Sequence, residues 1–253
     1  MNRTQILPAQ AASSLTVRST ARTHVGLVRT QNEDRVLERP QAGLWAVADG
    51  MGGHTGGEIA SGRIVEALQV LGGFASPYAW LNGVCEALQG VNRSLIAQAA
   101  SGPGPMGSTV VALLIHEGHY ACVWAGDSRA YRLRAAELQA LTHDHSLVQA
   151  LVDAGTISAD EARSHRQAHV ITRAVGDIEP LRLDVGNGAV APGDLFLLCS
   201  DGLTGLVRDE EIAGALMTND LEAAADELLT LALARGGRDN ISLVLVAAGT
   251  PGR

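Results

Sequence analysis

The feature that most constrains this chain is a series of acidic residues, each placed where an apolar segment meets a turn. An isolated Asp-Gly pair is ordinary turn chemistry. Five such turns beside apolar segments predict more, because strands that share two sheets can bring their ends together at one edge. The acidic positions are Glu33 and Asp34, after residues 25–29; Asp49, after 44–48; Asp127, after 123–125; Asp201, after 195–199; and Asp239, before 241–247.

Carboxylates that converge in this way require a cation, because crowded like charges repel one another and otherwise take up protons. Carboxylate oxygens, backbone carbonyls and water are the ligands of hard divalent cations such as Mg²⁺ and Mn²⁺. Gly50 suits the carbonyl role, since it has no side chain to block approach to its backbone. The five acidic turns therefore predict a divalent-cation site.

Apolar periodicity predicts an α+β fold in which antiparallel sheets pack between helices. Steps of three and four residues indicate helices from Glu58 and from Trp80. Helices and strands come in runs, which disfavours a doubly wound parallel sheet. Strands are expected at 25–29, 44–48, 110–115, 119–125, 129–133, 190–199 and 241–247, and further helices at 147–170, 209–217 and 221–235.

The charged residues exclude several classes of function. A formal net charge of −8 disfavours nucleic-acid binding through phosphate neutralisation. All 19 basic residues are arginines, so there is no lysine for a Schiff base, for a phosphate-binding loop or for a protein-kinase strand. A phosphatase with a cysteine nucleophile would need an arginine six positions later, but Gly205 occupies that position after Cys199.

The apolar segments and the cysteines predict the compartment. No stretch reaches the ~18 apolar residues of a membrane helix. Residues 1–14 lack the apolar core of a signal peptide and are expected to form a flexible N-terminal tail. Cys85, Cys122 and Cys199 form neither a close pair nor a zinc pattern, which favours buried free thiols. We therefore expect a cytoplasmic protein that binds no membrane.

Eight short motifs follow one another along most of the chain, from about residue 17 to residue 246. They are VRTQNED at 28–34, DGMGG at 49–53, GST at 107–109, GDSR at 126–129, DHS at 144–146, TRAVG at 172–176, SDGL at 200–203 and RDN at 238–240. Each is weak alone, but in this order they resemble the metal-dependent protein phosphatases of the 2C type, and specifically the compact bacterial serine/threonine members.

The resemblance implies a four-layer αββα sandwich, with two central antiparallel β-sheets flanked by helices and a metal cluster at one edge. It implies a single phosphatase domain over residues 15–249, preceded by the tail at 1–14. Residues 147–171 correspond to a flap beside the active site. Many relatives carry an acidic residue where this chain has His24, a departure that concerns local packing or a peripheral metal contact.

The same resemblance implies roles for the acidic residues in binding two or three Mn²⁺ or Mg²⁺ ions. Asp49 would bridge two ions, Asp201 and Asp239 would complete the first, and the Gly50 carbonyl would help to hold the second. Three further positions have secondary roles: Glu33 and Asp34 would act through water, and Asp127, with Asp201, would hold a third ion.

The implied reaction is hydrolysis of phosphoserine and phosphothreonine in proteins by direct attack of a metal-bridging hydroxide. Arg29 matches the arginine that binds the substrate phosphate, through two parallel hydrogen bonds from its guanidinium fork. The substrates would be phosphorylated proteins, and the expected partner is a bacterial serine/threonine kinase whose action this phosphatase opposes.

Two questions stay open at this level. The proton donor to the leaving oxygen is unassigned among His54, His143, His145 and a metal-bound water. The alternative function is that of a catalytically weak relative that binds phosphoproteins as a scaffold. Such a relative would be expected to have lost a ligand, whereas Asp49, Asp201 and Asp239 are all present.

Overall fold

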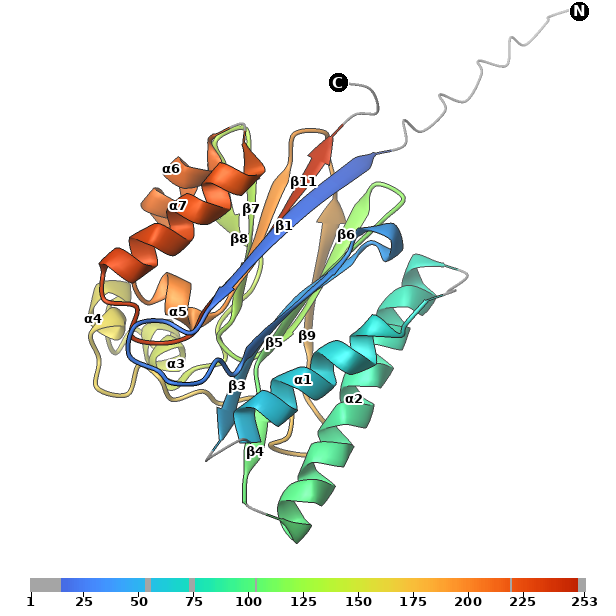
Figure 1. Cartoon of the computed structure of the whole chain (residues 1–253), viewed down its shortest axis with the longest axis vertical. Coiled ribbons are helices and arrows are strands. Elements are labelled where there is room, and N and C mark those ends of the chain that lie inside the picture. Colours follow the sequence, from blue (N-terminus) through green and yellow to red (C-terminus); the bar gives the residue numbers. More distant parts are fainter. Residues whose placement is uncertain (1–14, 53–55, 73–75, 103, 219, 250–253) are drawn as a thin grey trace, which may run out of the picture.

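Two antiparallel β-sheets pack face to face in the computed structural model of the chain, which describes residues 15–52, 56–72, 76–102, 104–218 and 220–249 (Figure 1). The first sheet has the strand order β1 (Thr16–His24), β11 (Ile241–Gly249), β10 (Leu195–Cys199), β7 (Arg129–Arg134) and β8 (Glu137–Ala140). The second has the order β2 (Asp34–Arg39), β3 (Leu44–Gly52), β5 (Val110–His116), β6 (His119–Ala125) and β9 (Asp184–Ala189), with β4 (Met106–Ser108) paired to β3.

Helices cover the outer face of each sheet (Figure 1). The second sheet is covered by α1 (Gly56–Gln69) and α2 (Pro77–Ser101), and α2 begins where the Ser76 side chain accepts a hydrogen bond from the Ala79 amide. The first sheet is covered by α5 (Asp201–Thr204), α6 (Asp209–Leu216) and α7 (Leu221–Ala234). The remaining short helices are η1 (Pro40–Ala42), α3 (Leu147–Asp153) and α4 (Ala159–Arg163).

The alternation of side chains along each strand divides the core into three apolar layers. In β3, Leu44 and Ala46 pack against α1 and α2, whereas Trp45 and Val47 pack between the sheets. In β10, Leu197 packs against α5–α7 on the opposite side. Three apolar layers between four layers of secondary structure confirm the predicted αββα sandwich.

Among the described residues, no helix is long and apolar enough to cross a membrane.

Two of the predicted strand boundaries near the acidic turns are wrong. Residues 25–29 form a turn after β1 instead of a strand, because Gly26 has φ +82° and packs against the backbone of Asp239, where a Cβ would lie 2.2 Å from the carbonyl oxygen. Asp34 therefore begins β2. Asp49 lies within β3, which continues to Gly52 because its last residues pair with β4.

The predicted helix over residues 147–170 is also mostly wrong. Only α3 and α4 are helical, and Gly155, with φ +66°, separates them. The strands β8 and β9 were not predicted, because their apolar patterns are weak. The strand predicted at 190–199 begins only at Leu195. Cys122 and Cys199 are buried free thiols as predicted, but Cys85 is only half-buried. The predicted tail at residues 1–14 lies outside the described residues.

The layer between the sheets is expected to be the main source of stability. Phe196 is fully buried there, and its ring lies edge-on to Tyr120 with the centroids 5.3 Å apart. Phe196→Ala should lower the free energy of unfolding by about 3–5 kcal/mol, because it removes buried area and leaves a cavity. Urea unfolding measures this loss. Met217→Ala, at a side chain 54% exposed, should change the free energy by less than ~0.5 kcal/mol; similar losses in both variants would contradict the layer assignment.

Candidate metal centre

The predicted acidic residues do converge, on a cavity of about 380 Å³ at one edge of the sandwich. Its walls come from segments that are far apart in the sequence, as the sheet-edge argument predicted. Arg29 and Gly50 line the same cavity. The carboxylates that line it are those of Glu33, Asp49, Asp127, Asp201 and Asp239.

Asp34 differs from the other predicted acidic residues because it does not line the cavity. It is buried beside it, with only 1% of its surface exposed. Its Oδ2 accepts a hydrogen bond of 2.8 Å from the Ser200 hydroxyl, directly before Asp201. Its Oδ1 is buried and has no hydrogen-bond partner among the described residues. A buried carboxylate oxygen without a partner is costly unless water or a cation completes its surroundings.

Strand pairing and backbone contacts fix the position of Asp49. Asp34 of β2 lies directly opposite Asp49 of β3 in the antiparallel register. The Asp49 amide donates to the Thr109 hydroxyl at 3.1 Å, and the Thr109 amide donates to the Asp49 carbonyl at 2.8 Å. At Gly50, a Cβ would lie 2.2 Å from the Gly57 carbonyl oxygen. Only glycine fits there, which keeps the Gly50 backbone close to the cavity.

Asn240 connects the loop before β2 to Asp239. Its side-chain nitrogen donates to the carbonyl oxygens of Val25 and Gln31, both at 2.9 Å. Its side-chain oxygen accepts from the Glu33 amide at 2.8 Å. These three hydrogen bonds hold Glu33 beside Asp239. Sequence analysis did not assign this role to Asn240; its position directly after Asp239 was the available signal.

Burial and mutual repulsion raise the pKa values of the clustered carboxyl groups. Burial comes first in every case, and neighbouring carboxylates add to it at Asp34, Asp49, Asp127 and Asp201. The pKa of Asp34 rises to about 6 and that of Asp127 to about 8. The pKa of Asp49 rises well above its ordinary value. The cluster therefore holds protons at neutral pH unless cations replace them.

The donor set fits hard divalent cations. It consists of carboxylate oxygens with the nearby backbone of Gly50, and such oxygens are the ligands of Mg²⁺ and Mn²⁺. Among the described residues, no group of three or more Asp, Glu, His or Cys side chains is already arranged to hold a metal ion.

Arg29 lies on the wall of the cavity. Its Nη2 donates to Asp239 Oδ2 at 2.7 Å, and the two side chains are 56% and 40% exposed. The hydrogen bond to Asp239 raises the pKa of Arg29, so the guanidinium remains charged. Its other nitrogens have no hydrogen-bond partner among the described residues. The Leu27 amide, which donates to the Gly237 carbonyl at 2.7 Å, holds this loop in place.

Neither of the described histidines proposed as proton donors lies in the cavity. His143 Nε2 bonds to Asp153 Oδ2 at 2.8 Å on the surface. His145 is buried and accepts a hydrogen bond from the Gly126 amide at 3.2 Å. The third proposed histidine, His54, lies outside the described residues. The cavity is instead lined by His169, which sequence analysis did not single out within 147–171.

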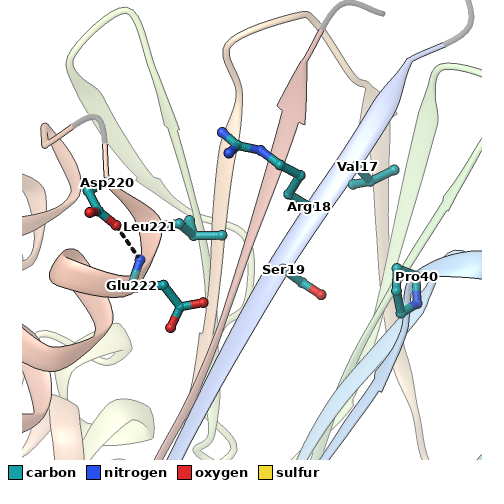
Figure 2. Close-up of a pocket in the computed structure, with 7 residues that line it drawn as sticks. All are labelled: Val17, Arg18, Ser19, Pro40, Asp220, Leu221 and Glu222. Carbon is teal, nitrogen blue, oxygen red and sulfur yellow. Dashed lines mark hydrogen bonds between the residues drawn. The ribbon is translucent and has the colours of Figure 1, made fainter.

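A second depression, of about 660 Å³, lies between the beginning of β1 and the beginning of α7 (Figure 2). Arg29 follows the opposite end of β1, so this depression is separate from the acidic cavity. The Asp220 carboxylate in it accepts from the Glu222 amide at 3.0 Å and caps α7. This depression contains no converging set of carboxylates and is not a candidate metal centre.

The sandwich of two antiparallel sheets is similar to solved structures of serine/threonine phosphatases. A structure described as the catalytic domain of the serine/threonine protein phosphatase PstP with two manganese ions superposes with a TM-score of 0.85 at 37% identity, over 93% of this chain and 100% of that one. The family model for Protein phosphatase 2C matches residues 27–235. The chain belongs to the protein phosphatase 2C family.

Two further relatives show how much of the chain this likeness covers. The serine/threonine protein phosphatase PstP of Mycobacterium tuberculosis is 40% identical over 239 residues, which are 93% of this chain and 46% of that protein. The chain thus spans about half the length of this relative. PppA, described as a regulatory component of the T6SS in Pseudomonas aeruginosa, superposes with a TM-score of 0.86 at 42% identity, over 93% of this chain and 100% of that one.

The raised pKa values predict how the stability of the metal-free protein depends on pH. A carboxyl group whose pKa is higher in the folded state destabilises the fold once pH passes its unfolded value, near 4, and the full cost is reached above its folded value. With EDTA, the melting temperature should therefore fall as pH rises from 5 to about 8, where Asp127 titrates. Differential scanning fluorimetry measures this fall.

Asp127→Asn provides the control, because it removes one of these ionisable groups at nearly constant volume. In EDTA its melting temperature should fall less steeply between pH 5 and 8 than that of the wild type. Saturating Mn²⁺ should raise the wild-type melting temperature more at pH 8 than at pH 5, since ligands must be deprotonated. Parallel curves for the two proteins, or a Mn²⁺ shift independent of pH, would contradict the account of the cluster.

Proposed function

We propose that the chain is a metal-dependent phosphatase that hydrolyses phosphoserine and phosphothreonine in proteins. The observation that carries this proposal is the convergence of five carboxylates and Arg29 on one cavity. Buried carboxylates with raised pKa values are poorly explained as a structural cluster when Arg29 is the only arginine or lysine among the described residues that line the cavity. The family membership and the manganese-containing PstP structure support the same function.

The assignment of residues to the cations follows the family resemblance, and the lining of the cavity supports it. Asp49 would bridge two ions, with Asp201 and Asp239 on the first and the Gly50 carbonyl on the second. Mn²⁺ or Mg²⁺ bound there would supply a nucleophilic hydroxide at neutral pH and neutralise charge on the phosphoryl group. The remaining carboxylates would act around this pair: Glu33 and Asp34 through water, and Asp127, with Asp201, on a third ion.

Arg29 binds the substrate phosphate in this proposal. Its free guanidinium nitrogens face a cavity that would otherwise be strongly anionic, and a guanidinium fork can donate two parallel hydrogen bonds to phosphate oxygens. The phosphoryl group is thus oriented with its oxygens toward Arg29 and the carboxylate-bound cations. Proteins phosphorylated by a serine/threonine kinase are the proposed substrates, so such a kinase is the proposed partner.

The scaffold alternative is not favoured by any feature of the cavity. A binding module that had lost catalysis would be expected to lack at least one ligand, whereas Asp49, Asp201 and Asp239 line the same cavity. Direct measurement of phosphate release separates the two functions.

Asp49→Asn and Asp239→Asn should each lower the turnover of a phosphothreonine peptide in Mn²⁺ by at least about 100-fold, because each removes a charged ligand from the reacting centre. Phosphate release, with and without EDTA, measures the effect. Asp177→Asn, at an exposed aspartate outside the cavity, is the matched control and should behave as the wild type. Activity that persists in EDTA, or equal activity in all four proteins, would overturn the proposal.

Arg29→Ala should raise KM for the phosphopeptide and lower kcat/KM by about 10- to 100-fold, the loss expected for charge-assisted hydrogen bonds. The melting-temperature shift produced by Mn²⁺ should stay close to that of the wild type, because Arg29 is not a ligand. Arg29→Lys keeps the charge but not the fork, and should be intermediate. An unchanged KM in Arg29→Ala would remove this residue from the phosphate site.

A further inference from the structure

One histidine lies on the wall of the acidic cavity without an assigned role. His169 lines the cavity together with Asp201, Asp239 and Arg29. Among the described residues that line it, His169 is the one histidine. Its side chain is exposed, which places it at the solvent-facing rim and not on the floor among the carboxylates.

The backbone around His169 is held firmly although the side chain is exposed. The Leu147 amide donates to the Val170 carbonyl at 2.8 Å, and the Thr172 amide donates to the His145 carbonyl at 2.7 Å. Ile171 forms a β-bridge with Ser146. These contacts fix the backbone immediately after His169 and so keep the His169 imidazole at the cavity.

The His169 imidazole is free to contact a bound substrate. No hydrogen bond or ion pair joins its side chain to another described residue, whereas the rings of His143 and His145 are both engaged away from the cavity. Burial and the neighbouring Asp239 raise the pKa of Asp201. His169 is close enough to Asp201 to lower that pKa electrostatically. The imidazole thus lies close to the reacting centre.

We propose that His169 donates the proton to the serine or threonine oxygen that leaves phosphorus. This inference rests on the proposed phosphatase function. The phosphoryl end of a substrate points toward the carboxylates and Arg29, so its peptide end and bridging oxygen lie toward the rim, where His169 stands. A donor at this position contacts the leaving oxygen in preference to the deeper, non-bridging oxygens.

A water molecule gives up one proton to solvent, and the resulting hydroxide oxygen forms a new bond to phosphorus. The bond between phosphorus and the bridging oxygen breaks. The electron pair of the broken bond goes to the serine or threonine oxygen, which takes the proton from the imidazolium of His169. The imidazole left behind recovers a proton from solvent. The products are inorganic phosphate and a free hydroxyl group.

Leaving-group dependence tests this role directly. A serine or threonine alkoxide is a poor leaving group and needs a proton, whereas p-nitrophenolate leaves without one. His169→Gln keeps the size and a hydrogen-bond donor but cannot transfer a proton. Its kcat for a phosphothreonine peptide in Mn²⁺ should fall by about 100-fold, while its kcat for p-nitrophenyl phosphate should change by less than about 3-fold. His143→Gln, at the surface histidine outside the cavity, should match the wild type on both substrates.

Three results would overturn the inference: an equal loss on both substrates, an unchanged kcat for the peptide, or a smaller Mn²⁺-induced melting-temperature shift in His169→Gln than in the wild type. The last would identify His169 as a cation ligand. Failure of the proposed function itself is visible separately, as a wild-type protein that releases no phosphate from either substrate in Mn²⁺.

Discussion

Repulsion among buried carboxylates is the constraint on which the site depends. Asp34, Asp49, Asp127 and Asp201 all have raised pKa values, first because they are buried and then because they face one another. Among the described residues that line the cavity, Arg29 is the only arginine or lysine. Charge therefore has to be balanced by protons or by bound metal ions, and divalent ions are the form that family membership supports.

Strand pairing, hydrogen bonds and core packing fix the positions of these carboxylates. The β2–β3 register places Asp34 opposite Asp49, and Thr109 fixes the Asp49 backbone with two hydrogen bonds. Asn240 holds the loop before β2 against the beginning of β11. Three apolar layers keep the strands that carry these residues in place. The carboxylates are thus held together by strand pairing and core packing, against their own repulsion.

Sequence reasoning found the carboxylates because each stands at a boundary between an apolar segment and a turn, and the ordered motifs supplied the fold. It misplaced the boundaries around Asp34 and Asp49, since the turn at Gly26 and the extension of β3 depend on contacts with Asp239 and β4. The roles of Asn240 and His169 were missed for a related reason. The contacts of both residues follow from tertiary packing; the motif at 238–240 includes Asn240 but does not predict its hydrogen bonds, and no local pattern singles out His169.

The most direct test of the central claim is equilibrium binding of Mn²⁺, followed by the electron paramagnetic resonance signal of the free aqueous ion. The wild type is predicted to bind two ions, and Asp49→Asn to lose both, because Asp49 would bridge the two ions in the proposed assignment. Asp177→Asn is predicted to bind as the wild type does. A wild-type protein that leaves the free Mn²⁺ signal unchanged, or an Asp49→Asn variant that binds as tightly as the wild type, would contradict the account.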